Sequence, residues 1–94
     1  MSSTVIESFQ PKQISASANV CGIAGFLGWV FCSSSAAGTC TIYDDSGTGT
    51  TTKIVDTFNL TAGTFYPMPF FAANGIYVVI GGTASITVGV MRQG

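Results

Sequence analysis

The chain has 94 residues, enough for one domain with a single hydrophobic core. Hydrophobic residues make up 47% of it and charged residues only 7%, against an average of about 25%, and the net charge is −1. This composition excludes a disordered chain, and three basic residues are too few to neutralise the phosphates of a nucleic acid. So few charges would protect a monomer poorly against self-association. We therefore expect much of the surface to be covered by copies of the chain or by a larger assembly.

The first third of the chain predicts strands at residues 4–9, 15–20 and 25–33. A short helix over residues 16–27 stays open as an alternative, because the pattern is least regular there. The most apolar stretch, residues 18–32, is shorter than the roughly 20 residues of a membrane-spanning helix, so we expect no membrane segment. The first residues lack the basic and apolar regions of a signal peptide.

Two further strands are predicted in the middle of the chain. Residues 39–43 form a short one, which ends in the polar, glycine-rich loop 44–49. Residues 53–60 alternate in polarity, but Asp56 falls among the apolar set. The pattern therefore does not decide which face of this strand is buried.

Residues 64–71 carry two prolines, Pro67 and Pro69. Proline has no backbone N–H, so each one removes a hydrogen-bond donor that a central strand needs for its ladder. We therefore expect an extended edge strand here.

The C-terminal part contains the strongest strand signals. Residues 75–80 are a continuous apolar run, as in a strand covered on both faces, and residues 84–91 alternate. The turn dipeptides Asn74-Gly75 and Gly81-Gly82 bracket the first run. The two segments are therefore predicted to form a hairpin.

Taken together, about eight short strands predict an all-β fold, an antiparallel β-sandwich or jelly-roll-like arrangement. We expect a single domain over residues 1–94, with residues 1–13 as a candidate extended N-terminal arm.

Histidine is absent, which removes the commonest general base and the usual partner of a nucleophilic Ser or Cys. We therefore expect no catalytic residues, no enzyme activity and no cofactor. Asp44 and Asp45 lack the spacing of a calcium loop and are expected to cap backbone N–H groups of a turn. Cys21, Cys32 and Cys40 lack the spacing of metal ligands, so we expect no metal site. Three buried, reduced thiols are favoured over one disulfide with a free thiol.

Aromatic residues cluster around the two prolines of residues 64–71. Adjacent residues on an extended segment point to opposite sides, so Phe70 and Phe71 cannot both enter one core, and one is a candidate contact with a neighbouring subunit. The interface candidates are Trp29, Tyr66, Met68, Phe70 and Phe71. A sugar-binding platform on Trp29 and Tyr66 is the competing interpretation, although the chain has few of the planar polar side chains that carbohydrate sites use.

Three runs of sequence carry a family resemblance. They are AAGTCTIYDD at residues 36–45, LTAGTFYPMP at residues 60–69 and ANGIYVVIGGTA at residues 73–84. Over residues 28–91 the chain resembles a group of small β-sandwich virion proteins of tailed bacteriophages.

This resemblance implies a structural protein of the virion, assembled in the host cytoplasm. The first expectation is a capsid decoration or cement protein that stabilises the shell as a homo-oligomer, a trimer or dimer, bound to the major capsid protein or another virion protein. A tail or head-fibre component is the alternative within this class. A carbohydrate- or receptor-binding β module is the alternative outside it. Contacts with nucleic acid or membrane are not expected.

Overall fold

The computed structural model describes residues 9–92, which form one antiparallel sheet of six strands. The strands are β1 (Gln10–Ile14), β2 (Ala18–Cys21), β3 (Gly25–Asp44), β4 (Lys53–Asn59), β5 (Thr64–Ala72) and β6 (Ile76–Arg92). The all-β prediction is therefore confirmed. The alternative of a helix over residues 16–27 is wrong, because β2 and the start of β3 occupy this segment. The described residues contain no helix that could span a membrane.

Two long strands, β3 and β6, are the centre of the sheet. They pair along nearly their whole length, from Gly25 opposite Arg92 to Asp44 opposite Ile76. The outer side of β6 carries β1 and β2, and the outer side of β3 carries β4 and β5. Every short strand is thus attached to one of the two long ones.

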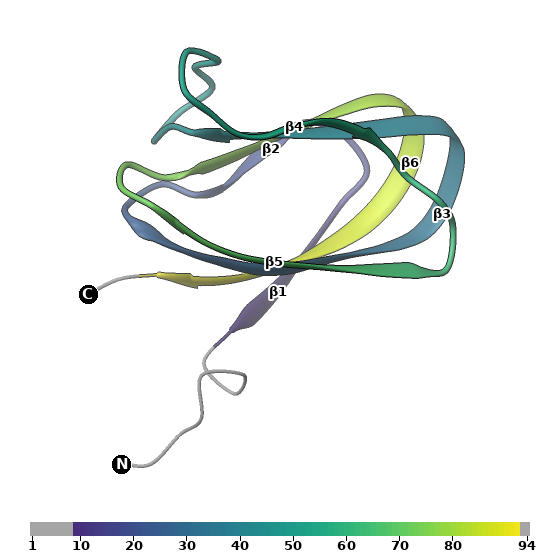
Figure 1. The fold of residues 1–94 in the computed structure, drawn as a ribbon, viewed down its shortest axis with the longest axis horizontal. Helices are drawn as coiled ribbons and strands as arrows, with labels where there is room; N and C mark the ends of the chain where they lie inside the picture. Colours follow the sequence, from purple (N-terminus) through teal and green to yellow (C-terminus); the bar gives the residue numbers. More distant parts are fainter. Residues whose placement is uncertain (1–8, 93–94) are drawn as a thin grey trace.

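Midway along, the paired strands bend and fold the sheet over on itself (Figure 1). The register shifts there, so that Ala37 and Gly38 of β3 face Gly82 of β6. Ala37 has a φ of 56° and Gly82 a φ of 68°, both in the left-handed region. An extra residue on one strand is a β-bulge, which bends and twists the pair locally.

The bend divides the sheet into two facing parts (Figure 1). The lower half-sheet consists of β1, β5, residues 25–32 of β3 and residues 86–92 of β6. The upper half-sheet consists of β2, β4, residues 39–44 of β3 and residues 76–81 of β6.

The hairpin predicted from residues 75–80 and 84–91 is wrong. Both segments belong to the single strand β6, and the Gly81-Gly82 dipeptide forms its bulge rather than a turn. The segments 25–33 and 39–43 are likewise parts of one strand, β3. The positive φ of Gly82 suits a bulge as well as a turn, and the chain continues because β3 supplies a partner on both sides of it.

The N-terminal segment is described only in part. Residues 10–13 of the candidate arm pair with residues 87–90 as most of β1. Phe9 directly precedes this strand. The rest of the strand predicted at residues 4–9 lies outside the described residues.

The core lies between the two half-sheets. Residues of the lower half-sheet alternate between buried and outward positions, as the period of two requires. Burial of each large aliphatic side chain contributes about 2 kcal/mol to folding. The largest fully buried side chains are Leu27, Val30, Cys32, Cys40, Ile42, Ile76, Val78, Ile86, Val88 and Val90.

Candidate interaction surface

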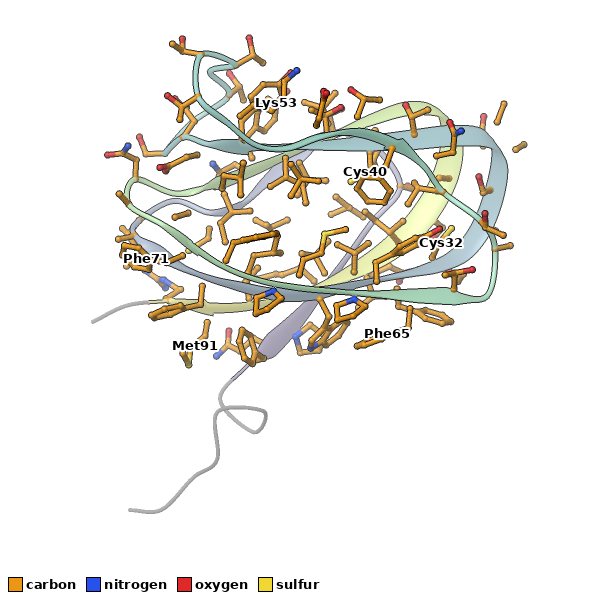
Figure 2. All side chains as sticks on the ribbon, viewed as in Figure 1. Cys32, Cys40, Lys53, Phe65, Phe71 and Met91 are labelled. Carbon is orange, nitrogen blue, oxygen red and sulfur yellow. The ribbon has the colours of Figure 1, made fainter. Side chains whose placement is uncertain are left out.

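The outer side of the lower half-sheet is covered by large apolar side chains. They alternate along the strands with buried core residues and therefore point away from the core. Figure 2 shows Phe65 and Met91 on this side, away from β4. We call this surface the aromatic face, and its members are Phe26, Trp29, Phe31, Phe65, Phe71 and Met91.

Rings from β3 and β5 meet across the strands of the aromatic face. Phe26 lies opposite Phe71 with ring centroids 5.0 Å apart, and Trp29 lies 5.8 Å from Phe65. Such pairs hold their rings in fixed positions and stabilise a sheet by about 0.5–1 kcal/mol each. Yet Phe65 is 55% exposed, Phe71 49% and Phe31 36%. The rings of Phe65 and Phe71 are therefore held by their paired neighbours but are still in contact with solvent.

A second bulge places Trp29 on this face. The register of β3 shifts between Leu27 and Trp29 against both neighbouring strands, so Trp29 leaves the inward side that Leu27 occupies. Its indole ring then covers Gly89, where any Cβ would overlap the ring. At Gly28 a Cβ would lie 2.7 Å from the ring of Phe9. Two glycines thus let Trp29 and Phe9 lie flat against the sheet.

The five interface candidates fall into three places. Trp29 and Phe71 belong to the aromatic face. Phe70 is 44% exposed, but it lies opposite the buried Leu27, at the free edge of β5. Met68 packs in the core and is not available on the surface.

Tyr66, the fifth candidate, also points inward. Its ring packs on Phe58 of β4, with centroids 5.2 Å apart. Its hydroxyl accepts a 2.9 Å hydrogen bond from the Thr61 N–H and donates one of 3.5 Å to the Asn59 carbonyl. Tyr66 therefore connects β5 to β4 and does not belong to the aromatic face.

Sequence reasoning missed Phe26, Phe31 and Met91 as members of the face, and it did not select Phe65 from the cluster around the prolines. Trp29 and Phe31 are two residues apart, which is the spacing of one strand face. That spacing was the available signal. Phe26 could not be added to it without knowledge of the bulge at Gly28.

Comparison of the chain with protein-family models, with curated proteins and with solved structures found no match.

The outer side of the upper half-sheet has a different character. Thr41 and Thr57 share a 2.6 Å hydrogen bond between their hydroxyls, and the rings of Tyr43 and Tyr77 lie 6.2 Å apart. The exposed Asp56 forms a 3.0 Å ion pair with Lys53 of the same strand. These strands hold polar groups where the lower half-sheet holds phenylalanine.

Asp45 organises the loop that follows β3. Its carboxylate accepts hydrogen bonds from the N–H groups of Gly49 (2.9 Å) and Gly47 (2.8 Å), and these bonds lower the pKa of Asp45. The Asn19 amide donates to the carbonyls of Asp45 and Gly47 at 3.0 and 2.8 Å. The prediction that Asp45 caps a local turn is confirmed.

Asp44 caps a turn that is distant in the sequence. Its carboxylate accepts hydrogen bonds from the N–H groups of Asn74 (2.8 Å), Ala73 (3.3 Å) and Gly75 (3.3 Å), and so ties the end of β3 to the β5–β6 connection. Among residues 9–92 no three His, Cys, Asp or Glu side chains gather in a way that could hold a metal ion. The carboxylate oxygens of both residues are instead used to hold backbone.

The three cysteines are free thiols and buried, as predicted. Cys32 and Cys40 lie in the space between the half-sheets, near the bend (Figure 2). Burial, with a smaller contribution from Cys32, raises the pKa of Cys40 to about 12. A thiol that holds its proton this strongly is a poor nucleophile, and this one packs as an apolar side chain.

Proposed function

We propose that this chain is a structural subunit that joins a protein assembly by burying its aromatic face. The observation that supports this is the cluster of ordered but exposed rings on one side of the molecule. Soluble monomers rarely keep a large contiguous apolar patch unless something covers it. Aromatic side chains and methionine are also the residues enriched at protein–protein contacts.

The free energy gained by burying the aromatic face can be estimated from the area of its exposed rings. Taking about 200 Å² for a whole phenylalanine, Phe31, Phe65 and Phe71 expose roughly 300 Å² together. Removing that area from water would contribute about 7 kcal/mol. This is comparable with the cost of association, about 4–15 kcal/mol, so these rings alone give a modest contact. Many such contacts in a symmetric assembly would make a stable one.

We further propose that the assembly is a bacteriophage virion and that the chain is a capsid decoration or cement protein, bound to the major capsid protein or another virion protein. In this proposal the bent sheet is a sandwich of jelly-roll type. The resemblance over residues 28–91 supports this role, as do the 7% charge and the absence of histidine. A tail or head-fibre component is the alternative in the same class.

A carbohydrate- or receptor-binding role is supported less well. Asn19 lies in the upper half-sheet, and its amide is engaged with the loop carbonyls. Gln13 is the planar polar side chain among the outward positions of the lower half-sheet, and its amide donates 3.2 Å to the Ser85 hydroxyl. The aromatic face therefore offers rings with little of the hydrogen bonding that orients a sugar.

The virion role is tested by counting copies of the chain in particles purified from a lysate. Hundreds of copies per particle are expected for a shell protein and about a dozen or fewer for a tail component. Absence of the chain from purified particles would overturn the virion role.

The use of the aromatic face is tested with the double variant Phe65→Asp/Phe71→Asp, which places two charges on exposed positions. We expect this variant to be lost from the particles. Asn59→Asp is the matched control, because it adds one charge at an exposed position of β4, in the other half-sheet. Retention of the double variant at wild-type stoichiometry would show that another surface mediates attachment.

A further inference from the structure

Among residues 9–92, the aromatic face carries no charged side chain. On the lower half-sheet the outward positions of β1 and β6 that flank the rings are Pro11, Gln13, Thr87 and Gly89. The described charged residues Asp44, Asp45, Lys53 and Asp56 belong to the upper half-sheet and its loop, while Lys12 and Arg92 lie at the rim of the lower half-sheet. Two copies of this face could therefore meet without repulsion and without burying an unpaired charge.

The free edges of the sheet are poorly suited to association. Pro67 and Pro69 remove two N–H donors from β5, and Pro11 removes one from β1. Along β4, two register shifts and the Lys53–Asp56 ion pair interrupt a regular edge. Prolines, bulges and charges are the devices that prevent edge-to-edge pairing of sheets. Growth by strand addition is thus disfavoured, and the aromatic face is the remaining surface for association.

The area of the face matches that of a specific contact. Four strands of 5 to 9 residues, about 4.8 Å apart and rising about 3.3 Å per residue, cover roughly 450 Å² in projection. Protruding side chains raise the accessible area above this value. A standard interface removes about 800 Å² from each partner. A stable contact would therefore need nearly the whole face, and an apolar surface of the same extent is the best match.

We propose that the aromatic face pairs with the same face of a second copy, giving a twofold-symmetric dimer. This rests on the proposed function, because it takes the same face as the association surface and names its partner. A contact of one face with itself closes after two copies. The outer sides of both upper half-sheets, with their threonines and tyrosines, then remain free for other contacts.

The first test is the mass of the purified chain by size-exclusion chromatography with light scattering, over about 1–100 μM. We expect twice the chain mass of 9.7 kDa for the wild type and for Asn59→Asp. Phe65→Asp/Phe71→Asp should be monomeric, with an affinity reduced at least about a hundredfold. Phe65→Leu should stay dimeric, because it keeps the position apolar. Circular dichroism and thermal unfolding confirm that each variant is folded.

Trp29 gives a second readout, because it is the only tryptophan and lies on the face. Its fluorescence should shift to shorter wavelength and become protected from acrylamide as the wild-type concentration rises. The double face variant should show neither change. A wild type that stays monomeric, or forms species larger than a dimer, would overturn the proposal. So would a monomer whose Trp29 responds to phosphatidylcholine vesicles, which would indicate a lipid surface as the partner.

The two proposals fail in distinguishable ways. If the wild type is a monomer but enters particles only when its aromatic face is intact, the virion role stands and the second copy is not the partner. If the dimer forms through the face but the chain is absent from particles, the dimer stands and the virion role fails.

Discussion

At the scale of single residues, the bend depends on one glycine. Gly82 has a φ of 68°, and any Cβ there would overlap the carbonyl oxygen of Ala37 across the ladder. Gly63, in the β4–β5 connection, has a φ of 78° but has nothing within 4 Å of where its Cβ would lie. A side chain added at either position would suffer the strain of a left-handed backbone. Only at Gly82 would it also overlap a neighbouring residue, Ala37.

This difference gives a paired prediction. Gly63→Ala should lower the free energy of unfolding by about 1 kcal/mol, the cost of a left-handed alanine. Gly82→Ala should lower it by about 2–4 kcal/mol, because the strain is joined by the overlap with Ala37. Urea unfolding monitored by Trp29 fluorescence measures both. Equal losses at the two sites would mean that the bend can relax around a side chain.

The Cys40 thiol predicts a dependence of stability on alkaline pH. Its pKa is raised from 9.0 to about 12 in the folded chain, so the unfolded chain releases this proton first. Stability is then fully present below about pH 9 and falls as pH rises toward 12, by at most about 1.4 kcal/mol per pH unit.

The check compares urea unfolding of the wild type and Cys40→Ala at a series of values from about pH 8 to pH 11. The variant should be less stable at pH 8, because a buried sulfur is lost, but its stability should fall less steeply with pH. Parallel slopes for the two proteins would show that burial of Cys40 does not control the alkaline loss.

The placement of Trp29 shows what the sequence could and could not predict at this scale. Strict alternation puts Phe26 and Trp29 on opposite sides of a strand, whereas the structure has both on the aromatic face. The bulge at Gly28 causes the change, and it depends on strands β5 and β6, far away in the sequence. Met68 and Tyr66 were misjudged for a related reason: which side of β5 faces the core is decided by its pairing with β3.

At the scale of elements, the two prolines of β5 limit what its edge can do. The sequence predicted this edge strand correctly, because the missing N–H groups are visible without any structure. The same residues lie beside the exposed rings of Phe65 and Phe71, where an added strand would bring apolar surfaces together.

Replacing both prolines should therefore allow the free edge of β5 to pair with strands of other molecules. We expect Pro67→Thr/Pro69→Thr to aggregate into species that bind thioflavin T, at concentrations where the wild type does not. Pro67→Thr/Pro69→Lys is the matched control, since it restores both N–H groups but adds a charge that opposes pairing. If both double variants stay as free of aggregation as the wild type, the prolines are not what blocks this edge.

The number and length of strands were harder to predict than their presence. Within residues 9–92, most segments with alternating or continuous apolar residues are strands, but two predicted pairs of short strands are single long strands, β3 and β6. Strand β1 was not among the predicted strands. Gly81-Gly82 satisfies the needs of a turn and of a bulge equally well. A bulge forms because Ala37 and Gly38 of β3 lie opposite Gly82. The local sequence around Gly82 does not reveal that β3 is its partner.

At the scale of the whole molecule, folding requires contacts between distant parts of the chain. Gly25 lies opposite Arg92, and each of the other strands attaches to this long pair. Folds dominated by such non-local pairing fold slowly, because the entropic cost of loop closure comes before the stabilising contacts form. Refolding from urea, followed by stopped-flow fluorescence of Trp29, should take milliseconds to seconds. Completion within tens of microseconds would contradict this account of the folding barrier.

The low charge of the chain predicts a surface that is covered by other molecules, and this stays a prediction; composition alone could not say which surface carries the apolar side chains. The structure separates exposed apolar side chains from charged ones. The rings occupy the lower half-sheet, while Lys53, Asp56 and the loop carboxylates belong to the upper one. This separation arises because the bend turns one continuous sheet into two outer surfaces.

The pairing of β1 with β6 also has a mechanical consequence. Gln10 lies opposite Val90, so residues 10 and 92 are at the same end of this antiparallel pair. A pull through these two residues would peel the strands apart one rung at a time and meet little resistance. A load applied across the aromatic face would instead be shared by four strands and by the bend behind them. The fold should therefore resist compression across the aromatic face well and resist tension between residues 10 and 92 poorly.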